Sequence, residues 1–226
     1  MGTSWTPSTI SRRRSTAARQ EAERAALINA ASEVLARSGW WGFKVESVLR
    51  QARLSTRSFY RQFDTKDDLL AALLERDLLR IATAVDGIID PSASIQDRFW
   101  QYVNALIEWA FDEDFAKPAA LFANSLRGLR PQHAELVERC LAALTAPLAE
   151  VLAEGNRRGV ITTKDPAGDA RIVLVLIGTA LYDGPATEAD DIREYLEQLV
   201  VPFIARSFNI DTPASGLTAL SRSGSD

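Results

Sequence analysis

The chain has 226 residues, 46% of them hydrophobic and 25% charged, which is ordinary for a globular protein and long enough for one large domain or two unequal ones. Its single cysteine, Cys140, excludes an internal disulfide and a cysteine metal cluster. The longest apolar run, at residues 172–181, is far shorter than the ~20 residues of a membrane span, and the first residues lack the apolar core of a signal peptide. We therefore expect a cytoplasmic protein with no membrane segment and no cofactor.

The formal net charge of −4 is divided unevenly along the chain. Residues 1–66 hold 12 Lys and Arg against 5 Asp and Glu, a net charge of +7, whereas residues 67–226 hold 14 against 25, a net charge of −11. A basic head on an acidic body indicates that only the head meets a polyanion. The alternative is a chance distribution of solvated charges.

Taken in chain order, residues 1–18 are rich in Ser, Thr and Arg without periodicity, so we expect a disordered basic leader. Such an arm can enter the minor groove of DNA or follow its phosphates, and the alternative is a solvated leader. Arg12, Arg13 and Arg14, with Arg19 just after the arm, precede the first predicted helix. An apolar stripe predicts the first helix over residues 22–37, and Ser38-Gly39 is a typical helix end.

Two short helices are predicted next, at residues 45–52 and 56–63, and Ser55 has the position of an N-cap for the second. Thr65 and Asp68 then have the spacing of a capping box, and an apolar pattern follows them. A long fourth helix is therefore expected to begin at this point.

The remainder of the chain also indicates helices, each begun by a capping pair or a proline. They are predicted over residues 94–109, 118–128, 131–158, 166–182 and 187–207, before a loose tail at 209–226. No pair of alternating β-branched runs with hairpin turns is present, so no strand is predicted. The expected fold is all-α, with about nine helices.

The segment 45–66, VESVLRQARLSTRSFYRQFDTK, has the most specific pattern, because two short helices joined by a three- to four-residue turn can lay a helix in the DNA major groove. The stretch 27–74 resembles the DNA-binding domain of the TetR family of transcriptional regulators. The ending Phe59-Tyr60-x-x-Phe63-x-x-Lys66 is the most specific part of the resemblance. The other matching residues are Ala30-Ala31, Gly39, Val48, Ala52, Leu54-Ser55 and Asp67-Asp68-Leu69-Leu70.

The third helix is expected to enter the groove by its N-terminal end. There Arg57 can offer two parallel donors to a guanine edge, and Thr56 and Ser58 can reach bases or phosphates. The resemblance implies that Tyr60, Gln62 and Lys66 contact the DNA backbone. The complete set of predicted DNA-binding residues is Lys44, Ser55, Thr56, Arg57, Ser58, Tyr60, Arg61, Gln62 and Lys66. The alternative for each is a solvated helix face.

Two residues depart from the family pattern. Arg53 stands in the turn where the family usually has a small residue, so either the turn differs or Arg53 adds a phosphate contact. Lys44 stands where family members often have Thr as an N-cap, and losing such a cap costs ~1 kcal/mol. A lysine at that position can instead anchor a phosphate.

Composition and the resemblance together imply four segments: a disordered leader at 1–18, a helix-turn-helix domain at 19–66, a helical ligand-binding and dimerisation domain at 67–208, and a disordered tail at 209–226. The helices at 166–182 and 188–207 carry more apolar surface than one packing partner needs, which predicts a four-helix interface in a homodimer. The predicted interface residues are Ile172, Leu176, Ala180, Ile192, Tyr195, Leu199 and Phe203. The alternative is burial of both helices within one subunit.

Aromatic residues concentrate in the middle helices, where the family places its ligand cavity. The predicted ligand-binding residues are Trp100, Trp109, Phe111, Phe115 and Phe122. Such a lining suits a small apolar or aromatic effector, and the alternative is an ordinary aromatic core.

The sequence therefore predicts a ligand-responsive regulator that binds a double-stranded, palindromic operator as a homodimer, more often to repress than to activate. A helical enzyme is one alternative, but one His and one Cys leave little material for a catalytic triad or metal site, and no Gly-rich phosphate loop occurs. A helical interaction protein without a DNA role is the other alternative.

Overall fold

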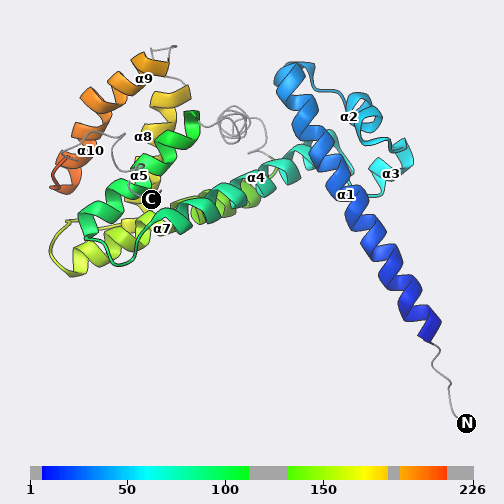
Figure 1. The fold of residues 1–226 in the computed structure, drawn as a ribbon, viewed down its shortest axis with the longest axis horizontal. Coiled ribbons are helices and arrows are strands. Elements are labelled where there is room, and N and C mark those ends of the chain that lie inside the picture. The colour runs from blue at the N-terminus through cyan, green and yellow to red at the C-terminus, as the bar shows by residue number, and fades with distance from the viewer. Residues whose placement is uncertain (1–6, 112–131, 183–188, 213–226) are drawn as a thin grey trace, which may run out of the picture. The chain divides into compact units, whose positions relative to one another are not determined.

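The computed structural model describes residues 7–111, 132–182 and 189–212, which form helices and short connections with no strand among them (Figure 1). The all-α prediction is confirmed. The chain divides into two compact units, Met1–Leu74 and Glu75–Asp226, and the division falls inside helix α4 (Lys66–Ile88). Among the described helices, none is long and apolar enough to cross a membrane.

The N-terminal unit begins with the long helix α1 (Pro7–Gly42), so the expectation of a disordered leader is corrected over residues 7–18. A proline suits the first turn of a helix, and the Ala, Arg, Gln and Glu residues that follow favour helix. The prediction of the first helix relied on apolar periodicity, which residues 7–18 lack. The predicted stop is confirmed by Gly39, where a φ of 63° interrupts the helix.

Helices α2 (Val45–Ala52) and α3 (Thr56–Tyr60) pack with α1 around an apolar core. The buried residues of this core include Leu27, Phe43, Val48, Phe59 and Phe63. The bounds of α2 agree with the prediction, whereas α3 ends three residues early. Its last turn tightens, because the N–H of Gln62 donates to the carbonyl of Phe59 at 2.8 Å, an i to i+3 bond.

The turn between α2 and α3 has the expected backbone despite the unusual residue in it. Arg53 takes the left-handed conformation, with φ 54° and ψ 41°, as a glycine would. The N–H of Leu54 donates to the carbonyl of Leu49 at 3.0 Å, which closes the end of α2. Ser55 then caps α3 as predicted, its Oγ accepting the N–H of Ser58 at 3.2 Å.

Helix α4 begins with the predicted capping box. The N–H of Thr65 donates to the Asp68 carboxylate at 2.9 Å, and the N–H of Asp68 donates to Thr65 Oγ1 at 3.1 Å. This reciprocal pair satisfies two backbone groups that a helix start leaves without partners.

The C-terminal unit packs α5 (Ile95–Phe111) against α7 (Ala134–Arg157) and α8 (Pro166–Tyr182). Its core includes Phe99, Tyr102, Ile107, Leu148, Leu152 and Ile177. The predicted caps hold: Ser94 Oγ accepts the N–H of Asp97 at 3.1 Å, and Asp165 Oδ1 accepts the N–H of Gly168 at 3.0 Å. The helix predicted over 118–128 lies outside the described residues.

The final predicted helix contains a π-helical turn that the sequence analysis did not foresee. Helix α9 (Ala189–Tyr195) passes through the wider turn Leu196–Val200 into α10 (Val201–Phe208). Here the N–H of Val201 donates to the carbonyl of Leu196, five residues back. Pro202 explains the widening, because it has no N–H and its ring would clash with a carbonyl four residues back in a regular helix.

The residues that directly follow α10 still contact the C-terminal unit. The backbone carbonyl of Asp211 accepts hydrogen bonds from Trp100 Nε1 at 2.9 Å and Gln96 Nε2 at 3.0 Å. The expected tail at 209–226 is therefore corrected over its first residues, since Ile210 is buried and Asp211 is tied to α5. Residues 213–226 lie outside the described part of the chain.

Candidate nucleic-acid interface

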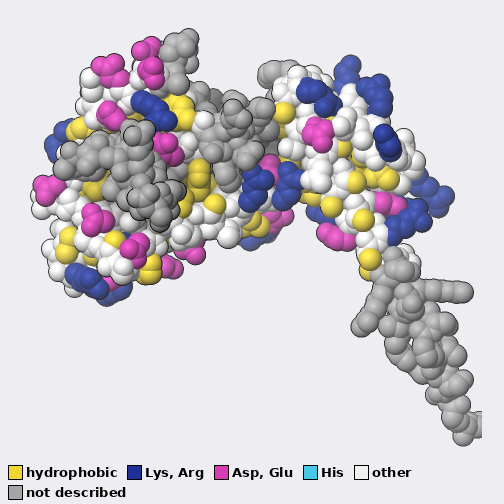
Figure 2. All heavy atoms as spheres, viewed as in Figure 1, with side chains coloured by type: hydrophobic (Ala, Val, Ile, Leu, Met, Phe, Trp, Pro, Cys, Tyr) yellow, Lys and Arg dark blue, Asp and Glu magenta, His cyan; other side chains and the backbone are white. Residues whose placement is uncertain are grey.

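The exposed side of α3 presents the residues best suited to read DNA. Thr56 and Arg57 lie exposed in its first turn, and Tyr60, one turn later, is 64% exposed. Within the described residues, the guanidinium of Arg57 has no hydrogen bond or ion pair, so all its donors are available to a base edge. Lys and Arg side chains (dark blue) gather over α2 and α3 in Figure 2.

The core of the N-terminal unit fixes the direction of Tyr60. Its ring packs edge-on against Phe59 at 5.3 Å between centroids, and Phe59 in turn contacts Phe63 at 5.9 Å. Because Phe59 is buried, the Tyr60 ring is anchored at one side while its hydroxyl end remains accessible. An aromatic side chain held in this way loses little further freedom when it contacts a phosphate.

Lys44 and Arg53 lie exposed at the two ends of α2. Lys44 is the N-cap residue, with φ −128° and ψ 135°, and its side chain makes no cap hydrogen bond. Arg53 is the left-handed residue that ends the helix. Both positions leave a flexible cation on the surface, which suits a phosphate contact.

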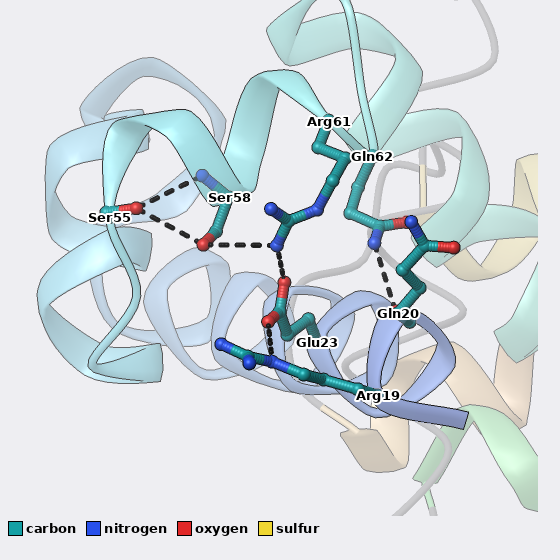
Figure 3. Close-up of polar contacts among 7 residues, drawn as sticks. All are labelled: Arg19, Gln20, Glu23, Ser55, Ser58, Arg61 and Gln62. Carbon is teal, nitrogen blue, oxygen red and sulfur yellow. Dashed lines mark hydrogen bonds and ion pairs between the residues drawn. The ribbon is translucent and has the colours of Figure 1, made fainter. Parts of the chain in front are cut away.

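Arg61 and Gln62, predicted to contact DNA, turn instead toward α1 (Figure 3). Arg61 Nη2 donates to the Glu23 carboxylate and lies 3.4 Å from Ser58 Oγ. Gln62 Nε2 donates to the backbone carbonyl of Gln20 at 3.0 Å. Both side chains therefore have partners within the N-terminal unit, and their contact with DNA stays a prediction.

Glu23 accepts from two arginines, since Arg19 Nε also donates to it at 3.0 Å. The hydrogen bond from Arg19, with that from Arg61, holds the pKa of Glu23 below its ordinary value of 4.5 against the opposing effect of burial. Glu23 stays charged at neutral pH. Sequence analysis missed this residue because its partner Arg61 lies 38 positions away.

Lys66 begins α4 beside two carboxylates. The first turn of α4 also holds Asp67 and Asp68, and the Asp68 carboxylate accepts from Thr65. The ammonium of Lys66 lies 5.4 Å from the centre of the Phe43 ring. The helix N-terminus therefore already faces carboxylates, which compete with a phosphate.

In the C-terminal unit, part of the predicted dimer surface is exposed. Four large apolar side chains, on α8 and on the π-helical turn and α10, are each more than half exposed: Ile172, Val175, Leu199 and Phe203. Leu176, Ile192 and Tyr195 are partly exposed. Ala180 is only 4% exposed, so its assignment to the interface is corrected: it shares the inward stripe of Val173 and Ile177.

The predicted ligand-binding aromatics that the structure describes differ in their burial. Trp100 is 2% exposed and belongs to the core, its ring packed on Phe99 at 5.1 Å. Trp109 and Phe111 are half-buried, and the Arg193 guanidinium of α9 stacks 4.3 Å from the centre of the Phe111 ring. Phe115 and Phe122 lie outside the described residues.

One polar residue in this region was not found from the sequence. Asn104 on α5 is 5% exposed, and its Oδ1 has no hydrogen-bond partner among the residues that the structure describes. A buried carbonyl without a partner costs about 1–3 kcal/mol, so such a group often marks a functional site. A single Asn on a buried helix gives no pattern from which its role can be predicted.

The fold and the exposed side of α3 define a helix-turn-helix DNA-binding protein with a larger helical unit. Residues 27–73 match the family described as "Bacterial regulatory proteins, tetR family". The chain is 28% identical over 161 residues to the HTH-type transcriptional repressor SCO4008 of Streptomyces coelicolor, covering 69% of this chain and 76% of that protein. It is 24% identical over 175 residues to the regulator UidR of Escherichia coli, covering 75% and 83%.

The solved structure of RolR in complex with resorcinol has the same fold, with a TM-score of 0.65 at 17% identity, over 91% of this chain and 96% of that one. The chain is therefore similar to transcriptional regulators of the TetR family, and residues 27–73 match the model of that family. These matches to transcriptional regulators confirm the predictions of a DNA-binding regulator and of a protein that is not an enzyme.

Proposed function

We propose that this regulator represses transcription as a homodimer on a two-fold symmetric operator and is released by a small apolar or aromatic effector. The proposed recognition of DNA by α3 is supported by its exposed first turn. There the guanidinium of Arg57 has no partner among the described residues. Arg57 would bind a guanine edge through two parallel hydrogen bonds, beside Thr56. Tyr60, Lys44 and Arg53 would bind phosphates.

The exposed apolar side chains of α8 and α10 support the homodimer. Neighbouring helices present Ile172, Val175, Leu199 and Phe203 to solvent, and a two-fold axis would bury eight such side chains from two copies. Two linked heads would then read two half-sites spaced by about one helical turn or more.

Replacing Leu199 and Phe203 together with Asp tests the dimer, because four carboxylates would enter the proposed interface. We expect a monomer by analytical ultracentrifugation at micromolar concentration. Val160→Asp is the matched control, since Val160 is also exposed but lies between α7 and α8. A double variant that sediments like the unaltered protein would contradict the proposed interface.

The effector part is supported by Trp109, Phe111 and Asn104 in the C-terminal unit. An effector with an apolar frame would pack on the aromatic rings, and one hydroxyl or amine on it could donate to Asn104 Oδ1. RolR, with the same fold, binds the hydroxylated aromatic resorcinol. The effector would bind more tightly to a conformation in which the spacing of the dimer's two N-terminal units differs from the spacing of the two half-sites. The dimer would then release the DNA.

The effector part is tested with a duplex that the protein selects from a randomised library. Fluorescence anisotropy would follow binding of this duplex in the presence of hydroxylated aromatic compounds, beginning with resorcinol. We expect at least one compound to weaken binding about tenfold, which corresponds to a coupling of ~1.4 kcal/mol. Asn104→Leu should abolish that response. Compounds that bind the protein and only strengthen DNA binding would contradict release by effector.

A further inference from the structure

The three residues that follow α3 all contact the same side of α1. Arg61 pairs with Glu23, Gln62 donates to the carbonyl of Gln20, and the ring of Phe63 lies 4.6 Å below the guanidinium of Arg24. Positions 20, 23 and 24 recur at helical spacing, so they form one face of α1. Polar contacts therefore fasten the C-terminal end of α3 to α1 beside the apolar core.

The Glu23 pair also reaches the first turn of α3 (Figure 3). Arg61 Nη2 lies 3.4 Å from Ser58 Oγ, and Ser58 Oγ lies 3.2 Å from the N-capping hydroxyl of Ser55. A continuous series of hydrogen bonds thus runs from Arg19 on α1 through Glu23 and Arg61 to Ser55. The end of α3 that faces DNA is connected to α1 through this series.

Glu23 is an unexpected residue in a head that binds a polyanion. Its carboxylate side chain is only 9% exposed, and at neutral pH it carries a negative charge that repels phosphates. A charge alone would weaken DNA binding, and its removal would strengthen it. A buried carboxylate also needs partners, and here two arginines supply them.

We infer that Glu23 and Arg61 are positioning residues for DNA recognition: the pair sets the direction of α3 against α1, and Arg61 contacts no phosphate. The inference rests on DNA binding through α3. Base reading then falls to Thr56 and Arg57, while the pair determines whether they meet the base edges at the correct angle. Loss of the pair therefore reduces discrimination between sequences more than it reduces general affinity for DNA.

The first experiment compares Glu23→Gln with Glu21→Gln, which removes an exposed carboxylate two residues away on α1. The probes are a duplex selected by the unaltered protein from a randomised library and a scrambled duplex of the same length and composition. We expect Glu23→Gln to bind the selected duplex about tenfold more weakly and the scrambled duplex unchanged. Glu21→Gln should bind both as the unaltered protein does, or slightly more tightly.

The second experiment measures how affinity for the selected duplex depends on salt. A phosphate contact contributes about 0.9 to the slope of log affinity against log salt concentration. Arg61→Gln should lose about as much affinity as Glu23→Gln and keep the slope of the unaltered protein. The double variant should lose no more than either single variant, because both changes break one interaction. Arg61→Lys, which keeps the charge pair, should recover most of the selectivity.

Three results would overturn the inference. Tighter binding by Glu23→Gln would show that its charge only repels DNA, and a slope lowered by about 0.9 in Arg61→Gln would show a phosphate contact. An equal loss on both duplexes, together with a lower melting temperature by circular dichroism, would show a merely destabilised head. If the unaltered protein selected no duplex at all, DNA binding through α3 would itself fail, which is a distinguishable outcome.

Discussion

The left-handed backbone of Arg53 makes a specific prediction about stability. At φ 54° and ψ 41° an L-residue with a Cβ is strained by about 1–2 kcal/mol, and glycine is not. Glycine loses about 0.4–1 kcal/mol more entropy on folding than alanine, which offsets part of this gain. Arg53→Gly should therefore be about 1 kcal/mol more stable than Arg53→Ala, which corresponds to a melting temperature about 2–4 °C higher.

The comparison with alanine isolates the backbone because both variants remove the same charge. Thermal unfolding by circular dichroism measures the stability difference. If Arg53 contacts a phosphate, both variants should also lower the salt slope of duplex binding by about 0.9, to the same extent. Equal melting temperatures for the two variants would refute the argument from backbone strain.

Three further predictions concern a cap, an ion pair and a buried amide. Ser55→Ala removes the acceptor for the Ser58 N–H and should destabilise the protein by ~1 kcal/mol in urea unfolding, and an unchanged stability would contradict the role of this cap. The hydrogen bond from Arg98 holds the pKa of Glu154 below 4.5. The ionised Glu154 therefore stabilises the folded protein fully above pH 4.5, and this stabilisation is lost as the pH falls through the lowered pKa. In Glu154→Gln the stability should fall less steeply with decreasing pH. Asn104→Leu removes an unpaired buried carbonyl and should raise the melting temperature; a lower one would contradict the absence of a partner.

Local features of this fold were predictable from the sequence. The bounds of α2, the cap at Ser55 and the Thr65–Asp68 capping box all depend on residues within four positions of one another. Backbone groups at helix ends need partners, and only a few side chains can supply them at that spacing. The same logic placed the helix break at Gly39.

Features that depend on tertiary structure were not predictable. Ala180 lies on a helix that is apolar over a broad face, so the sequence does not show which of its residues point to the core. In the structure the side chain of Ala180 is buried. Arg61 resembled its cationic neighbour Arg57, yet it pairs with Glu23 from α1. The sequence does not show which charged residues lie close together in the fold, so the proposed positioning role of Arg61 could be inferred only from the structure. The sequence contains Pro202, but the π-helical turn that accommodates this proline was not predicted.

The central claim is that the first turn of α3 reads DNA through Arg57. The most direct measurement is the affinity of Arg57→Ala for the selected and scrambled duplexes, with Arg37→Ala as control because Arg37 is an exposed arginine that donates to Gln51. We predict that Arg57→Ala loses about 1–3 kcal/mol on the selected duplex, with a relaxed preference at one guanine position, and much less on the scrambled duplex. Arg37→Ala should bind both normally. An Arg57→Ala variant that keeps its full affinity and preference for the selected duplex would contradict the account.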